Sequence, residues 1–347
     1  MRRGMNRRIR YSPSGTFMAR IALVHDIAGV ATVQAELLRG AGHDVEQIAL
    51  PTHGASWKWP AKALAVPVRL AAFVPTILKL RRGRYDIVHI HFLSQGVVGV
   101  LAGVPFFAQA HGSDLHTNLE NPAYRRVTRS VLEKAKKVFY VTPNLPAYMD
   151  GFRAKLVYLP NPVDVGERAR AAPAPTDARR LLIFTRLHPI KGVDKIFGAV
   201  EPLKALGADV TALDYGPLAP EYAIRYGEWV RFVKPIPHAE VGNFLAGFDV
   251  VIGQMRQGIL SLMEIEALAA GRPVITAIDR SLYPNDPPPV IEASGHDEIV
   301  AAVERLRGQP RELVRISRDS RDWAVRNHGY AHHLALLEAA YFGGRAG

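Results

Sequence analysis

The sequence predicts an α/β fold with two domains, each built around a parallel, doubly wound β-sheet. The chain has 347 residues, and at about 150 residues per domain this length favours two domains. Short apolar runs alternate with helix-length segments along the whole chain, which is typical of parallel sheets. With 48% hydrophobic and 22% charged residues, the chain can bury sizeable cores, which excludes a mostly disordered protein.

The first half of the chain alternates strand-like apolar runs with helical patterns. The expected strands are residues 20–25, 44–49, 86–91, 104–111 and 137–142. We expect helices over residues 31–41, in the small-residue stretch before residue 104, and from Pro122 onward. Residues 92–110 are uncharged but contain Gly and Pro, so they predict a buried helix and a strand, not a membrane span.

The second half repeats this alternation after a segment rich in Ala, Pro and charge, residues 167–180, which we interpret as a linker. Further strands are expected at residues 180–185, 208–214, 229–233, 249–253 and 272–276, and the last helical pattern covers about residues 311–341. The predicted organisation is a basic, disordered extension (1–17), a Rossmann-like domain (18–166), the linker (167–180), a second Rossmann-like domain (181–325) and a C-terminal helix (326–347). This last helix is the candidate to cross back to the first domain. Such a pair would hold a ligand in a cleft between the halves, beyond the carboxyl ends of the strands.

The cysteine count and the N-terminus limit the cellular setting. The absence of Cys excludes disulfides, Cys-ligated metals and cysteine nucleophiles, and it fits a reducing compartment. Residues 1–17 contain five Arg but no apolar core of a secretory signal. We therefore expect a cytoplasmic protein, with a peripheral position on the inner face of the membrane as a further expectation.

The net charge of +12 is unevenly distributed. Residues 1–17 contribute +5, residues 18–166 contribute +7, and residues 167–347 are neutral. Residues 57–84 contain seven cations, no acid, and interleaved aromatic and aliphatic residues, which suits anionic lipid. An ordinary solvated helix pair is the alternative, and nucleic acid is disfavoured because no zinc-finger or RNA-binding signature occurs. The candidate membrane or acceptor residues are Trp57, Lys58, Trp59, Lys62, Arg69, Lys79, Arg81 and Arg82.

Two motifs in the second half suit a diphosphate. Arg186 follows the first strand of that half and Lys191 comes five residues later, so two cations lie near a strand end. At the start of a predicted helix, the N–H groups of Ser261 and Leu262 can stabilise an anion. Glu266 can share their face of the helix and bind a ribose diol, whereas Glu264 projects from another face. The alternative is that these side chains are simply solvated.

Taken together, the motifs resemble the retaining family-4 glycosyltransferases of the GT-B fold, also called glycosyl transferases group 1. The resemblance covers nearly the whole chain after Met18 and depends on the order and spacing of short motifs. These are DIVHIH (86–91), HGSDLH (111–116), PNPVD (160–164), RLHPIKGVD (186–194), YGP (215–217), residues 230–251 and EALAAGRPVI (266–275).

The resemblance implies a GT-B enzyme, with two Rossmann-like domains facing each other across a cleft, that transfers a sugar from a UDP- or GDP-sugar with retained anomeric configuration. It implies no further cofactor. By match, Arg186 and Lys191 hold the diphosphate and Glu266 the ribose, while His111 lies beside the donor sugar. Gly29 would allow backbone to approach the phosphate, and Gly216 and Gly258 belong to the same donor site. Because the basic half is the expected acceptor half, we expect a lipid-linked or cell-envelope acceptor.

One position departs from the family pattern. The family usually has two Glu separated by seven residues, of which the first contacts the donor sugar, but here that position is Gly258. The adjacent Gln257 or the nearby Glu264 are the candidates to replace it. No Asp-x-Asp pair occurs, so we expect a metal-independent site in which the cation pair and helix dipole neutralise the diphosphate. The alternatives are a catalytically impaired GT-B module that binds nucleotide or membrane, and a nucleotide-sugar epimerase of the same fold.

Overall fold

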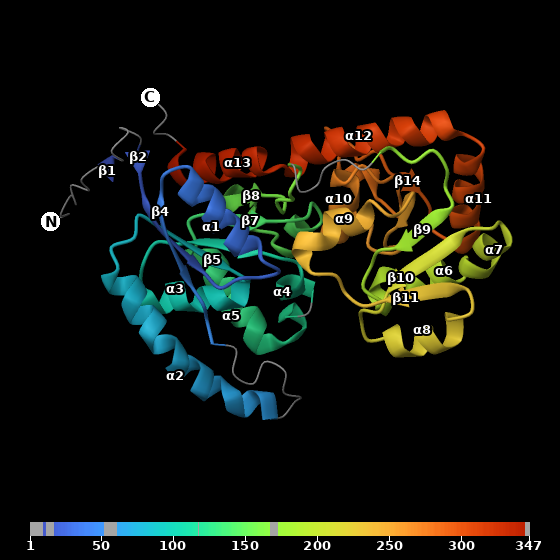
Figure 1. The fold of residues 1–347 in the computed structure, drawn as a ribbon. Helices are drawn as coiled ribbons and strands as arrows, with labels where there is room; N and C mark the ends of the chain where they lie inside the picture. Colours follow the sequence, from blue (N-terminus) through green and yellow to red (C-terminus); the bar gives the residue numbers. More distant parts are fainter. Residues whose placement is uncertain (1–9, 12–16, 52–60, 117, 167–172, 344–347) are drawn as a thin grey trace. The chain divides into compact units, whose positions relative to one another are not determined.

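The computed structural model describes residues 10–11, 17–51, 61–116, 118–166 and 173–343. They divide into two compact units (Figure 1). The first unit comprises Met1–Pro160 and Leu334–Gly347, and the second comprises Asn161–His333. Each unit contains its own six-stranded sheet in which all strand pairs are parallel, which confirms the predicted α/β fold class.

The sheet of the first unit has the strand order β4-β3-β5-β6-β7-β8. Its strands are β3 (Arg20–Val24), β4 (Asp44–Ile48), β5 (Ile87–His91), β6 (Phe107–Ala110), β7 (Val138–Tyr140) and β8 (Leu156–Tyr158). Alternate residues of a strand face opposite sides, so Ile21 and Leu23 join one core while Ala22 and Val24 join another.

Helices cover both faces of this sheet. The core that contains Ile21 is closed by α1 (Val30–Gly40) and by the end of α13 (Tyr330–Phe342). The core that contains Ala22 is closed by α2 (Ala61–Arg82), α3 (Val97–Ala102) and α5 (Pro122–Lys134). A short helix, α4 (Ser113–His116), follows β6. The alternation of strands and helices therefore produces the doubly wound arrangement that the sequence predicts.

The sheet of the second unit has the order β11-β10-β9-β12-β13-β14. Its strands are β9 (Arg180–Ile183), β10 (Asp209–Leu213), β11 (Val230–Val233), β12 (Val250–Ile252), β13 (Val274–Thr276) and β14 (Ile291–Glu292). One face is covered by α6 (Val193–Phe197), α7 (Val200–Ala205), α8 (Ala219–Tyr226) and α11 (His296–Arg307). The other face is covered by α9 (Val241–Leu245), α10 (Leu262–Ala269) and α12 (Pro310–His328).

The observed division differs from the boundaries expected from sequence. Residues 161–166 were expected in the first domain, but Val163 forms a parallel bridge with Gly329, and its N–H donates to the carbonyl of His328 at 2.9 Å. The expected single C-terminal helix is two helices, α12 and α13, which Gly329 separates in an extended conformation. The chain returns to the first unit at residues 333/334, inside α13.

The N-terminal extension also differs from expectation where it is described. Arg10–Tyr11 (β1) pairs antiparallel with Phe17–Met18 (β2), so these residues form a short ladder and not a disordered extension.

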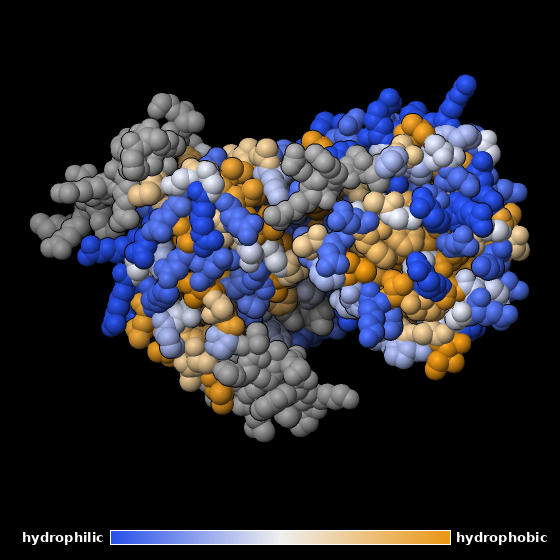
Figure 2. Space-filling view, viewed as in Figure 1, coloured by the Kyte–Doolittle hydropathy of each residue, from blue (hydrophilic) through white to orange (hydrophobic). Residues whose placement is uncertain are grey.

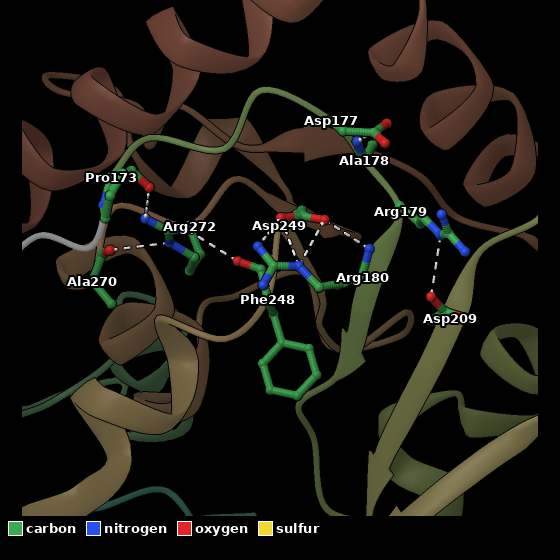
Figure 3. A network of polar contacts seen from close by, with 10 residues as sticks. All are labelled: Pro173, Asp177, Ala178, Arg179, Arg180, Asp209, Phe248, Asp249, Ala270 and Arg272. Atoms are coloured by element: carbon green, nitrogen blue, oxygen red, sulfur yellow. Dashed lines mark hydrogen bonds and ion pairs between the residues drawn. The ribbon is translucent and has the colours of Figure 1, made fainter.

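A buried arginine, Arg272, joins three backbone segments of the second unit. The Arg272 side chain is only 1% exposed, and its guanidinium donates to the carbonyls of Pro173, Phe248 and Ala270 at 3.0–3.2 Å (Figure 3). Arg180, at the start of β9, forms an ion pair with Asp249 at 2.6 Å beside it. A buried guanidinium must satisfy its donors, and here one carbonyl within the expected linker and carbonyls of two other segments do so.

Candidate functional site

Strand order identifies where each sheet can bind a ligand. In the second unit, the chain winds from β9 outward to β10 and β11, then returns to place β12 on the other side of β9. The point where the winding direction reverses is the usual ligand site of an open parallel sheet, at the carboxyl ends of the strands. Arg186 and Lys191 follow β9, and Gln254 and Gln257 follow β12, so these four residues come from the two strands at this point.

Arg186 lies on the loop after β9, where it is exposed. Its guanidinium carbon is 5.8 Å from the centre of the Tyr215 ring. Gly216 has a φ of +124°, and a Cβ atom there would lie 2.5 Å from the carbonyl oxygen of Leu187. The sequence motif Tyr215-Gly216-Pro217 therefore lets the loop after β10 approach the loop that carries Arg186.

Lys191 ends a 3-10 turn (Pro189–Lys191) and is half-buried. Its Nζ donates to Oε1 of Gln257 at 2.5 Å, and its carbonyl accepts the N–H of Met255 at 2.8 Å. Burial lowers the pKa of the Lys191 ammonium, the charge of Glu264 raises it, and the charge of Arg186 lowers it. The second cation of the predicted pair is thus held against the loop that follows β12.

That loop is organised by Gln254, a fully buried residue that no sequence pattern singled out. Its Nε2 donates to the carbonyls of Ile259 and Ala277 at 2.9 and 2.8 Å, and its Oε1 accepts the N–H groups of Arg256 and Gln257. One amide therefore fixes both ends of the segment that contains Gln257 and Gly258. Gly258 has a φ of +68° within this segment.

Glu264 was predicted in the donor site, and its surroundings revise that expectation. The side chain is 0% exposed. One carboxylate oxygen accepts from Gln254 N and Thr276 Oγ1 at 2.8 and 2.7 Å, and the other accepts from Ser261 N at 2.6 Å. Both oxygens are used inside the protein, so Glu264 orders the loop and caps α10, and we no longer expect it to contact a ligand.

The same contact changes the expectation for the α10 N-terminus. Because Ser261 is the N-cap and its N–H is bonded to Glu264, it does not present that donor to an anion. Leu262 is the first helical residue and remains the predicted donor of this pair.

Glu266, the predicted ribose ligand, lies two residues further along α10 than Glu264. Its side chain is 13% exposed, and its Oε1 is 3.0 Å from Nε2 of His238. The hydrogen bond to Glu266 raises the pKa of His238, burial opposes this, and the charges of Glu266 and Asp164 add to the rise. His238 was not selected from sequence, because a lone exposed histidine in a loop has no distinguishing pattern.

The first unit has its own candidate ligand edge, where β3 and β5 mark the change in winding direction. Three non-glycine residues have left-handed φ values there: His25 (66°) and Ala28 (52°) after β3, and Phe92 (70°) after β5. Such conformations are costly and cluster at functional sites. Gly29, predicted to approach a phosphate, follows with a φ of 77° at the start of α1.

His111 follows β6 at the same edge. Burial lowers the pKa of its ring to about 3, with a smaller contribution from the charge of His25. The buried Asp114 carboxylate accepts the N–H groups of Leu93, His111 and Gly112 at 2.9–3.2 Å, and burial raises its pKa to about 6 against these hydrogen bonds. Asp114 belongs to the HGSDLH motif, but its role as the clamp that positions His111 is visible only in the structure.

Two further histidines extend inward from His111. His91 Nδ1 lies 3.1 Å from His111 Nε2, and the ring of His89 stacks on His91 with 4.6 Å between centroids. His89 Nδ1 lies 2.6 Å from the hydroxyl of Tyr341 on α13. The DIVHIH motif therefore places one imidazole behind the site and one in the core.

The predicted membrane residues are described only in part. Trp57, Lys58 and Trp59 lie outside the described residues, as do the side chains of Lys62 and Arg69. Lys79 forms an ion pair with Glu46, whereas Arg81 and Arg82 are exposed and form no ion pair with another described residue. None of the helices in the described part of the chain has the length and apolar content needed to cross a bilayer.

Comparison with known families matches both units. A glycosyl transferase 4-like domain matches residues 27–162, and a glycosyl transferase-like domain matches residues 198–339. The chain is 24% identical over 326 residues to a D-inositol 3-phosphate glycosyltransferase of Thermobispora bispora, covering 80% of this chain and 76% of that protein. It is 26% identical to the Mycobacterium tuberculosis (strain H37Ra) protein of the same name, covering 61% of this chain and 52% of the relative, about half its length.

Solved structures show the same fold at low sequence identity. A sucrose-phosphate synthase from Thermosynechococcus elongatus has a TM-score of 0.70 and 17% identity, covering 93% of this chain and 98% of that chain. HepE from Anabaena, solved in complex with UDP-glucose, has a TM-score of 0.68 and 14% identity, covering 92% and 99%. With two parallel-sheet units, each matched by a glycosyltransferase domain in the expected order, the chain belongs to the group 1 glycosyltransferases of the GT-B type.

Proposed function

We propose that this glycosyltransferase moves a sugar from a UDP- or GDP-sugar to an acceptor hydroxyl with retention of anomeric configuration. The observation that supports it most is the arrangement of Arg186 and Lys191 after β9 in the second unit, with Glu266 on the adjoining α10. Two cations suit a diphosphate and a carboxylate suits a ribose diol. The complex of HepE with UDP-glucose is consistent with this donor class, and the inositol 3-phosphate glycosyltransferase relatives are consistent with sugar transfer.

The proposed chemistry is electrostatic and needs no protein nucleophile. As the bond between the sugar and the diphosphate breaks, Arg186 and Lys191 stabilise the charge that develops on the leaving group. The acceptor hydroxyl attacks from the face that the diphosphate leaves and passes its proton to the departing diphosphate oxygen, which retains the anomeric configuration. The pKa of about 3 keeps the His111 ring neutral at physiological pH, so it can hydrogen-bond to sugar hydroxyls without adding charge.

Replacement of Lys191 tests the diphosphate assignment. We expect Lys191→Ala to weaken binding of UDP or GDP by about tenfold or more, because a charge-assisted hydrogen bond contributes about 1.5–3 kcal/mol. The measurement is titration calorimetry, with a thermal melt to verify folding. Lys204→Ala is the matched control, since it removes the same charge from an exposed position on α7 of the same unit.

Unchanged nucleotide affinity and transfer rate in Lys191→Ala would contradict the assignment. Transfer assays with a panel of nucleotide sugars then separate the alternatives. Nucleotide binding without turnover would favour an impaired binding module, and a changed sugar nucleotide formed without acceptor would favour an epimerase.

We further propose that the acceptor is lipid-linked or part of the cell envelope, and that α2 brings the protein to an anionic membrane. The outward face of α2 is apolar: Val68, Val74 and Leu78 are 59%, 48% and 38% exposed. Ala71 and Pro75 are also exposed, and Figure 2 shows orange surface in the region where Figure 1 places α2. The helix ends in Arg81 and Arg82. An exposed apolar face beside cations suits a bilayer surface more than water.

A further inference from the structure

The direct partner of Lys191 is a neutral amide. Its ammonium donates to the side-chain carbonyl of Gln257 at 2.5 Å, next to the position where the family pattern has a glutamate. A carboxylate in that place would form an ion pair with Lys191 and offset its charge. An amide oxygen orients the ammonium but leaves its full positive charge in the site.

The placement of Gln257 is determined by the fold. Its backbone N–H donates to Oε1 of the fully buried Gln254, whose own Nε2 is held by two carbonyls. On the other side, the Lys191 carbonyl accepts from Met255 N at 2.8 Å. The two loops are therefore joined by a backbone hydrogen bond as well as by the side-chain contact between Lys191 and Gln257.

The nearest acid does not offset the charge by direct contact. Glu264 influences Lys191 through space, but both of its oxygens are bonded to Gln254, Thr276 and Ser261. The other charged neighbour, Arg186, is itself a cation. Among the described residues, no ion pair to Lys191 occurs, so the loops after β9 and β12 keep an excess of positive charge where the diphosphate is proposed to bind.

We infer that Gln257 is a positioning and specificity residue that holds Lys191 toward the diphosphate without neutralising it, and that presents its own amide donor to the ligand. This inference rests on the proposed function. Oε1 already accepts from the Lys191 ammonium, so we assign the ligand contact to the NH₂ of Nε2, which can only donate. Its partner is therefore an acceptor atom, such as a phosphate oxygen, whereas a glutamate would select hydroxyl donors.

The test compares two substitutions of Gln257. Gln257→Met keeps the side-chain volume but removes the amide, and Gln257→Glu places a carboxylate in contact with Lys191. We expect affinity for UDP or GDP, measured by titration calorimetry, to fall in the order wild type, Met, Glu, with Gln257→Glu at least about tenfold weaker than wild type. The difference between the Met and Glu variants should shrink at high ionic strength, and binding of the uncharged nucleoside should change little.

Gln309→Glu is the matched control, because it adds the same charge at an exposed position of the same unit. The inference is overturned if Gln257→Glu binds the diphosphate as well as wild type or transfers sugar faster, or if the Met and Glu variants lose affinity equally. Thermal melts separate these results from misfolding. If the wild-type chain binds no nucleoside diphosphate, the proposed function itself fails. If the wild-type chain binds and the variants have the same affinity, only the inference about Gln257 fails.

Discussion

His328 is a fully buried histidine whose titration affects folding. Its Nδ1 lies 2.9 Å from the carbonyl oxygen of Asn161. Burial is the main cause that lowers its pKa from 6.5 to about 4. The hydrogen bond to Asn161 opposes this shift, and the charge of His332 adds to it. Between pH 6.5 and 4 the unfolded chain binds a proton at this ring that the folded chain does not. Stability therefore falls as the pH falls through this window.

We predict that acidification from pH 7 to pH 5 destabilises the second unit through His328 by about 2 kcal/mol. His328→Gln should lower the stability at pH 7 but reduce this pH dependence, because the amide can still donate to Asn161 and does not titrate. The measurement is denaturant unfolding at both pH values. His296→Gln, at an exposed position elsewhere in the same unit, is the control. An equal pH dependence in wild type and His328→Gln would refute the prediction.

Other residues of the site show what sequence can and cannot identify. Arg186 and Lys191 could be selected as candidates from sequence, because cations after a strand end have a direct chemical meaning, and their role at a diphosphate stays a prediction. Glu264 was expected at the donor and Gln254 was not selected at all, because their roles depend on hydrogen bonds to backbone groups that come together only in the folded loop. A buried carboxylate that caps a helix and a carboxylate that binds a ligand have the same appearance in sequence.

At the scale of elements, α2 has the clearest consequence for function. It is apolar on both sides: Phe73 and Leu80 face the core, while Val74 and Leu78 are exposed. We predict that the protein floats with vesicles containing phosphatidylglycerol, and that Arg81→Glu with Arg82→Glu weakens this binding at least about tenfold, since each cation near an anionic surface contributes about 1 kcal/mol. High salt should weaken binding in the same direction.

The matched control is Lys204→Glu with Arg311→Glu, which makes the same charge change at exposed positions in the second unit. Val74→Gln with Leu78→Gln tests the apolar contribution. Failure of the wild-type chain to bind phosphatidylglycerol vesicles, or equal losses in the two double charge reversals, would count against a membrane role for α2.

The elements themselves followed the sequence closely where they are long or apolar. The expected strands at 20–25, 86–91 and 249–253 correspond to β3, β5 and β12. The edge strands β8 and β14 were not expected, because they are short and carry no clear alternation. The break between α12 and α13 was also missed, since Gly329 is extended through its bridge with Val163, a contact distant in sequence.

At the scale of the molecule, the first unit is assembled from both ends of the chain. Tyr341 packs against Phe107 and Phe139 and is bonded to His89. We predict that Tyr341→Ala destabilises the first unit by about 3–5 kcal/mol, as for other large aromatic truncations, and leaves the second unit unaffected. Hydrogen exchange read by mass spectrometry locates the effect.

Tyr341→Phe is the conservative control, because it removes only the hydroxyl and should cost about 1–3 kcal/mol. Increased exchange in the second unit, or equal effects of the two substitutions, would contradict this account of Tyr341.

The discontinuous first unit has a consequence for biosynthesis. A ribosome makes its sheet strands first, but Leu337, Ala340 and Tyr341, which complete one of its two cores, emerge only after the whole second unit has been translated. During that interval the second unit can fold from a continuous segment, while the first must wait with an uncovered aromatic surface around Phe107 and Phe139. The unit that is translated first is therefore the one that finishes folding last, and a nascent-chain chaperone would find its binding surface there.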